Sequence, residues 1–267
     1  METKRNTKYF IAPPISVPTL IGWAIIALGV IFMIIGHELM LAGVLVAIAG
    51  LTVVIVSSGG KSEESDIDFQ ISQATRDLQE QSEKKFEVYE KSFLKMLKPV
   101  NLHGYDFEAT EEPFYYKKGK DGTSRTNYFA GVNLIFTSEK MFVYGKRFSI
   151  TDESINSEIA ASYYFNELDK AILEEKKYTY TKKDKTVEVP YYVFKILKTD
   201  GEPALRMCVD YGADIDKYVE LISRAITTRK SELEKRAIET AERRAAFRAK
   251  VEAEKEAIER GEMYADE

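Results

Sequence analysis

The sequence predicts an α+β fold in which a hairpin of two transmembrane helices carries a long juxtamembrane helix, an antiparallel β domain and a long charged helix. Two observations predict it. Two apolar runs, at 17–35 and 39–56, contain no charged residue and are separated by three residues. The hydrophobic period then changes from helical to twofold near residue 101 and returns to helical near residue 214. The expected segments are a cytoplasmic N-terminal segment at 1–16, a transmembrane hairpin at 17–56, a linker and juxtamembrane helix at 57–100, a β domain with its closing helix at 101–229, and a charged helical tail at 230–267.

The two apolar runs have the length that a bilayer requires. At about 1.5 Å per residue each helix is roughly 27–29 Å long, about the thickness of the hydrocarbon core. A soluble protein rarely has enough core to hide two adjacent segments of this kind, so we expect both to cross a membrane. The connection Gly36-His37-Glu38 predicts a turn at the membrane surface.

Glycine recurs every seven residues through the hairpin, at Gly22, Gly29, Gly36, Gly43 and Gly50. A seven-residue step returns to nearly the same helix face. Ala47 adds another small residue four positions after Gly43. Small residues let helix backbones approach closely in lipid, so these residues predict a helix-packing seam. The seam either joins the two arms of one hairpin, which we favour, or joins neighbouring subunits.

Basic residues flank the hairpin on one side only. Lys4, Arg5 and Lys8 precede the first run, Lys61 follows the second, and the turn between the runs has no Lys or Arg. The positive-inside rule therefore places both chain ends in the cytoplasm. We expect a two-pass protein of the cell (inner, cytoplasmic) membrane.

The segment after the hairpin is polar and helical in pattern. Residues 62–97 contain no glycine or proline, and short apolar stripes at helical spacing run over 67–78 and 86–97. We expect one long juxtamembrane helix with a candidate break near Ser82. Oligomerisation as a coiled coil and a spacer that packs on the next domain are both open. We favour the spacer because the stripes are too short for a coiled coil.

From about residue 101, apolar and polar residues alternate. Val132, Leu134 and Phe136 share one face of a strand pattern, and the next pattern begins after the turn at 137–139. Further strands are expected at 140–150, 163–165, 171–175, 177–182, 187–198 and 204–211. Many short strands with close turns predict an antiparallel barrel or sandwich.

A helical pattern follows the last strand. Ile215, Val219, Ile222 and Ile226 repeat at helical spacing behind Asp214. The helix continues through 229–260, where basic and acidic residues are mixed and the apolar stripe is thin. We expect an exposed charged helix there, with a partner-binding coiled coil as the alternative.

The order of these elements resembles a known family. The residues that carry the resemblance are LIFTSEKMFVY at 134–144, YYFNELDKA at 163–171 and the turn TDG at 199–201, followed by the helix from residue 214. Residues 101–229 resemble bacterial pleckstrin-homology-like (PH-like) domains. The resemblance implies a bent antiparallel sheet closed by the C-terminal helix.

Two clusters of basic residues lie on predicted hairpins. In phosphoinositide-binding members of the pleckstrin-homology group, a basic first hairpin holds the lipid headgroup, so the resemblance implies the same candidate role here. A basic residue near an anionic leaflet contributes about 1 kcal/mol to binding. Ordinary solvated hairpin tips are the alternative, which we favour. The candidates are Lys117, Lys118, Lys120 and Arg125 in the first cluster and Lys182, Lys183 and Lys185 in the second.

Composition excludes several classes of protein. Cys208 is the single cysteine, so the chain forms no intramolecular disulfide, in agreement with a reducing compartment. The net charge of −5 argues against nucleic-acid binding. His37 and His103, the two histidines, have no partner at metal-ligand spacing. No nucleophile elbow, phosphate-binding glycine loop or zinc-protease motif occurs, so we expect neither an enzyme nor a cofactor.

Three functions remain open at this point. The first is a membrane-anchored scaffold that binds a protein partner or assembles with itself through the β domain and long helices. The second is a subunit of a homo-oligomeric channel or transport-accessory complex, whose glycine faces would meet neighbouring subunits. The third is sensing of anionic lipid headgroups by the basic hairpins.

Overall fold

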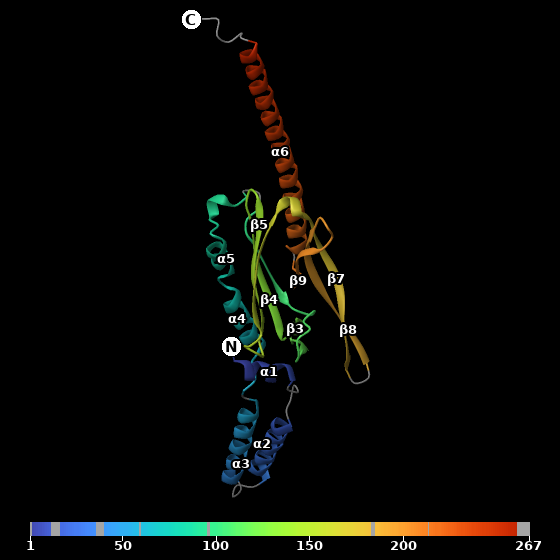
Figure 1. The fold of residues 1–267 in the computed structure, drawn as a ribbon. Coiled ribbons are helices and arrows are strands. Elements are labelled where there is room, and N and C mark those ends of the chain that lie inside the picture. Colours follow the sequence, from blue (N-terminus) through green and yellow to red (C-terminus); the bar gives the residue numbers. More distant parts are fainter. Residues whose placement is uncertain are drawn as a thin grey trace.

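The computed structural model describes residues 2–11, 17–35, 40–58, 60–94, 97–182, 185–212 and 214–260. The molecule is elongated (Figure 1). A pair of helices lies at one end, a β domain with flanking helices lies in the middle, and one long helix extends from the far end of the domain. The expected α+β class is confirmed. The predicted turn at 36–38 lies outside the described residues.

The two apolar helices pack against each other and leave their other sides exposed. Helix α2 (Val17–Ile35) and helix α3 (Met40–Ser58) are both long and apolar enough to cross a membrane. Large apolar side chains such as Ile34 and Leu41 are more than three-quarters exposed, at 78% and 76%. An apolar outer surface suits lipid and is costly in water. The two helices are therefore candidate membrane spans.

Helix α1 (Thr3–Ile11) lies across the domain at the end that faces this hairpin (Figure 1). Tyr9 is buried in an apolar cluster with Ile67 and Phe129. Asn6 donates a hydrogen bond from Nδ2 to the carbonyl oxygen of Ile150 at 2.7 Å. The segment expected as a plain N-terminal extension is thus a helix fastened to the β domain.

The expected long juxtamembrane helix is instead two shorter helices. Helix α4 (Glu64–Thr75) and helix α5 (Leu78–Phe86) are separated at Arg76-Asp77, and a 3₁₀ turn, η2 (Glu90–Ser92), follows. The break comes before Ser82, which lies buried within α5. Both helices lie along one face of a sheet (Figure 1), and a straight helix would leave the curved surface of that sheet.

That sheet has four antiparallel strands in the order β1-β4-β5-β6. A separate hairpin, β2-β3, is inserted between β1 and β4. His103 lies within β1. The strands are β1 (Val100–Tyr105), β2 (Tyr116–Lys118), β3 (Ser124–Thr126), β4 (Tyr128–Phe136), β5 (Lys140–Ser149) and β6 (Asn156–Tyr164).

A second sheet has three antiparallel strands in the order β7-β8-β9. Gly104 of β1 allows the two sheets to meet, because a Cβ there would lie 2.6 Å from the Cα of Val209 in β9. The two strands expected at 171–175 and 177–182 form one long strand. The elements after β6 are η3 (Phe165–Glu167), β7 (Leu168–Lys182), β8 (Lys185–Lys198), β9 (Pro203–Val209) and α6 (Ile215–Glu259).

The main apolar core lies between the two sheets and the first turns of α6. It contains Leu134 and Phe136 of β4, Phe194 of β8, and Ile222 and Ile226 of α6, all essentially without exposed surface. The predicted closing helix therefore packs on the sheets with the face that its spacing indicates. The strands form separate sheets, and a closed barrel is not shown.

Strand β4 is buried along its whole length, although its sequence alternates. Val132 and Leu134 face the main core. On the other face, α4 and α5 cover the strand, and a Cβ at Gly131 would meet Thr75 Cγ2 at 2.7 Å. The alternating pattern accounts for the face toward the main core, and helices from an earlier part of the chain bury the second face.

Candidate functional site

Basic residues of the first cluster lie on the β2-β3 hairpin, at the end of the domain nearest α1 (Figure 1). Lys117 and Lys120 line a pocket of about 400 Å³ together with Lys61, which follows α3, and Tyr9 of α1. Lys118 is exposed at the end of β2. The structure thus adds Lys61 and Tyr9 to the predicted residues. Both residues lie far from the hairpin in the sequence, so no local pattern pointed to them.

The charge in this pocket is only partly compensated. Lys117 Nζ donates a hydrogen bond to the carbonyl oxygen of Tyr9 at 2.6 Å and lies 3.8 Å from the centre of its ring. Burial lowers the pKa of Lys117, and the charge of Lys61 lowers it further, while Glu64 opposes both effects. Glu64 also accepts the backbone N–H of Lys120 at 2.8 Å, and Glu63 lines the pocket.

Arg125, the fourth member of the predicted cluster, lies inside the domain. Its side chain is 2% exposed, and Nη2 lies 2.8 Å from Asp68 Oδ2 and 2.7 Å from Asp121 Oδ2. Burial opposes the charged guanidinium, but the hydrogen bonds with Asp121 and Asp68 outweigh it and raise the pKa of Arg125. Contrary to expectation, Arg125 is not available to a lipid headgroup, because two carboxylates already occupy it.

The second basic cluster lies at the β7-β8 hairpin. Lys182 and Lys185 end β7 and begin β8, with side chains that are not described, and Lys183 lies outside the described residues. Nearer the domain, Lys177 Nζ pairs with Glu188 Oε2 at 2.7 Å. This hairpin therefore gives no described group of unpaired lysines.

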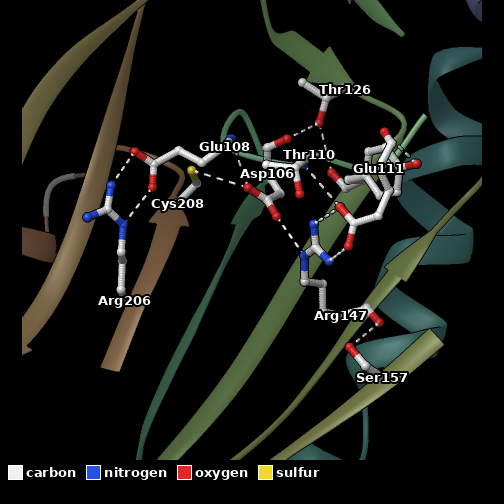
Figure 2. A network of polar contacts seen from close by, with 10 residues as sticks. Asp106, Glu108, Thr110, Glu111, Thr126, Arg147, Ser157, Arg206 and Cys208 are labelled. Carbon is white, nitrogen blue, oxygen red and sulfur yellow. Dashed lines mark hydrogen bonds and ion pairs between the residues drawn. The ribbon is translucent and has the colours of Figure 1, made fainter. Parts of the chain in front are cut away.

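A network of polar contacts fastens the loop that follows β1 (Figure 2). Glu111 accepts two hydrogen bonds from Arg147 of β5, at 2.5 Å from Nη1 and 2.7 Å from Nη2. Asp106 accepts a third, from Arg147 Nε at 2.8 Å. The bonds from Arg147 hold the pKa of Glu111 at about 2, so the pair stays ionised at neutral pH.

The same loop also reaches the second sheet. Glu108 accepts hydrogen bonds from Arg206 of β9 at 2.6 and 2.8 Å, and its Oε1 lies 2.8 Å from Lys176 Nζ of β7 (Figure 2 shows the Arg206 contact). Burial raises the pKa of Glu108, but these two cations outweigh it and hold the pKa at about 2. The carboxylates of this loop pair with cations from both sheets. The network is therefore a structural clamp that joins the loop to the two sheets.

Cys208 lies beside this clamp, with Sγ 3.6 Å from Asp106 Oδ1 (Figure 2). The thiol is 4% exposed, and desolvation raises its pKa to about 12. The thiolate is the reactive form of cysteine, and a raised pKa means that little of it exists at pH 8. We therefore expect a thiol-specific disulfide reagent to label Cys208 at pH 8 only after denaturation. A Ser231→Cys variant on the exposed side of α6 should label rapidly without denaturant; fast labelling of Cys208 in the folded protein would contradict the burial.

The predicted glycine seam lies between the two arms of the hairpin. A Cβ at Gly29 would lie 2.6 Å from the backbone nitrogen of Ala47 and 2.7 Å from the carbonyl oxygen of Gly43. A Cβ at Gly22 or Gly50 would meet the opposite helix at 2.6 and 2.8 Å. The described glycine faces are thus used within one hairpin, whereas Gly36 lies outside the described residues.

Nothing among the described residues indicates a metal site, since no three His, Cys, Asp or Glu side chains gather as ligands there. His103 stacks on Phe129 at 6.1 Å between ring centres. Comparison with protein-family models, curated proteins and solved structures finds no significant match.

Proposed function

We propose that the chain is a non-catalytic, membrane-anchored interaction protein that presents α6 to a protein partner on the cytoplasmic side of the inner membrane. The observation that carries this proposal is the length of α6. Its 45 residues extend about 67 Å, yet its last residue packed on the main core is Leu233. The rest of the helix stands clear of the domain, at the end opposite α2 and α3 (Figure 1).

The projecting part of α6 exposes large apolar side chains. Phe247 is 68% exposed, Ile238 58% and Ile258 48%. Helices gain most of their stability from packing an apolar face, and no neighbour among the described residues covers one here. Helices that dock in this way commonly insert such side chains into a partner.

The remainder of the chain can hold this helix at a membrane surface. The four-stranded and three-stranded sheets, followed by a helix that packs between them, agree with the proposed PH-like identity of residues 101–229. Lys4, Arg5 and Lys8 on α1 and Lys61 after α3 support a cytoplasmic domain held against an anionic leaflet. In this orientation α6 points into the cytoplasm.

The test compares the full chain with a chain that ends after Glu234, both purified in detergent from membranes of the source organism. We expect proteins that co-purify with the full chain to be lost from the shortened one. Far-UV circular dichroism of the shortened chain serves as the control for its folding. An unchanged set of co-purifying proteins would remove α6 as the binding element. Light scattering with the detergent contribution subtracted decides between a partner and self-assembly, since a monomer has a mass near 30.4 kDa.

A second candidate is recognition of anionic lipid headgroups by the pocket at Lys61, Lys117 and Lys120. Its support is the pocket's volume, its excess of positive charge and its place next to the end of α3. Native mass spectrometry would compare retention of phosphatidylglycerol with that of phosphatidylcholine. A Lys61→Gln/Lys120→Gln variant that retains phosphatidylglycerol as well as Lys118→Gln does would end this candidate.

The channel hypothesis has less support. A homo-oligomeric pore needs helix faces that meet other subunits, and the described glycines pack against the partner helix of the same hairpin. The outer faces of α2 and α3 are apolar and offer no polar stripe to line a pore.

A further inference from the structure

The projecting part of α6 has two faces of opposite character. Successive residues of an α-helix are about 100° apart, so positions three, four and seven residues apart share a face. The face that packs on the domain at Ile226 continues along the helix as far as Val251. Glu234 borders it at the domain end, and no acidic residue lies on it from Arg236 to Val251. We call it the basic face; its members are Leu233, Arg236, Ala237, Thr240, Arg244, Phe247, Arg248 and Val251.

The opposite side of the same stretch carries two of its three acidic residues, together with Lys235. Glu239 and Glu242 lie there, together with Ala246 and Ala249. Arg243 and Lys250 lie at the border of the basic face and add to its charge. Apart from Lys235 and Glu234, positive and negative side chains thus lie on different sides of this stretch, whereas a helix that is merely solvated has no need of such separation.

A groove leads from the domain onto the basic face. Where α6 leaves the domain, Tyr164 of β6, Leu233 and Ala237 give a pocket of about 390 Å³ a mainly apolar surface; Glu139, Asn166, Lys230 and Glu234 also line it. Ala237 also lines the next hollow along the helix, with Arg244 and Arg248. The two hollows share Ala237 in their lining, so an elongated segment can lie along both. Its first part would contact apolar groups and its second part arginines.

We propose that this groove and the basic face bind an amphipathic α-helix of another protein, with an apolar stripe flanked by glutamate or aspartate residues. This inference rests on the proposed function and names the chemistry of its partner. An apolar stripe would cover Leu233, Phe247 and Val251. Flanking carboxylates would pair with Arg236, Arg244 and Arg248, and such charge complementarity selects partners and speeds association.

A second copy of this chain fits the surface poorly. Two copies in one membrane hold their α6 helices parallel, which would place Arg244 against Arg244 and Arg248 beside Arg243. Like charges in contact disfavour association. An antiparallel pair would direct the two candidate membrane hairpins to opposite ends of the complex (Figure 1). The acidic partner is therefore the better occupant.

The experiment places the photo-crosslinking amino acid p-benzoyl-phenylalanine at single alanine positions of the full chain in membranes of its source organism. Position 237 lies on the basic face, and position 246 on the opposite face serves as the matched control; both alanines are exposed. We expect a crosslinked protein at 237 and not at 246, with the crosslinked segment, identified by mass spectrometry, helical in pattern and acidic. Equal crosslinking at both positions, a product of two copies of this chain, or a basic partner segment would each overturn the inference.

Charge reversal then tests the electrostatic part. Arg244→Glu/Arg248→Glu is expected to lower crosslinking at 237 by about tenfold or more, because reversal turns attraction into repulsion at two positions. Glu239→Lys/Glu242→Lys on the opposite face is the control and should leave the yield within about twofold. If the protein crosslinks at 246 alone, α6 still binds a partner and only this inference fails. If neither alanine gives a product and truncation after Glu234 changes nothing, the proposed function fails with it.

Discussion

Replacing Asp68 and Asp121 together by asparagine is expected to destabilise the β domain by about 3 kcal/mol or more. Both carboxylates contact the guanidinium of Arg125, which is 2% exposed. Asparagine keeps the shape of the side chain but removes the negative charge, so a buried cation remains without compensation. The contact joins α4 to the β2-β3 hairpin, and α4 is therefore expected to loosen first.

Removing Arg125 instead of its two carboxylate partners should destabilise the β domain less. Arg125→Met removes the buried charge and leaves Asp68 and Asp121 at 51% and 42% exposure, where water solvates them. We expect a loss of about 1–2 kcal/mol. Urea unfolding of the detergent-solubilised chain, followed by circular dichroism, measures both variants. Arg224→Met, in the exposed pair with Glu220, is the matched control, with an effect below about 0.5 kcal/mol. A double asparagine variant more stable than Arg125→Met would contradict this account.

Leucine in place of Gly29 or Gly43 is expected to force α2 and α3 apart. A Cβ at Gly29 would lie 2.6 Å from a backbone nitrogen, and one at Gly43 would lie 2.6 Å from the carbonyl oxygen of Gly29. Backbone atoms have no alternative rotamer, so the helices must separate. Overpacking of this kind costs about 1–3 kcal/mol, and backbone contacts favour the upper end.

The rate at which a disulfide forms between α2 and α3 measures whether these helices have separated. The hydroxyl oxygens of Thr19 and Ser57 lie 2.9 Å apart between the two helices. Cysteines at these two positions, in a Cys208→Ser chain, should oxidise to an intramolecular disulfide, and Gly29→Leu should slow this reaction strongly. Ala27→Leu, at an exposed site of α2, is the control and should not. A disulfide that joins two chains would show instead that the seam lies between subunits, as the channel hypothesis requires.

Several features of the fold followed from local sequence alone. The two uncharged runs predicted α2 and α3, because the length of a helix needed to cross lipid depends only on the rise per residue. The spacing of Ile215, Ile222 and Ile226 predicted the buried face of α6, because helical periodicity places them on one side. Long, regular patterns of this kind need no knowledge of distant segments.

The candidate sites were harder to predict, because they depend on contacts between distant segments. Lys117 and Arg125 both lie on one hairpin, yet one lines a pocket with Lys61 and the other is enclosed by Asp68 and Asp121. Their closeness in the sequence does not show which of the two residues is open and which is buried. Only the packing of α4 against the hairpin decides which basic group remains open to a ligand.

Local patterns were enough to predict the candidate membrane spans, the α+β class and the long charged helix, because each follows from hydrophobic length or period. Tertiary structure decided where α1 docks, where the juxtamembrane helix breaks and why both faces of β4 are buried. It also decided that the described glycines meet within one hairpin and that the basic face of α6 begins at an apolar groove. These features arise when segments far apart in the chain exclude water from one another, and no local pattern records which segments will meet.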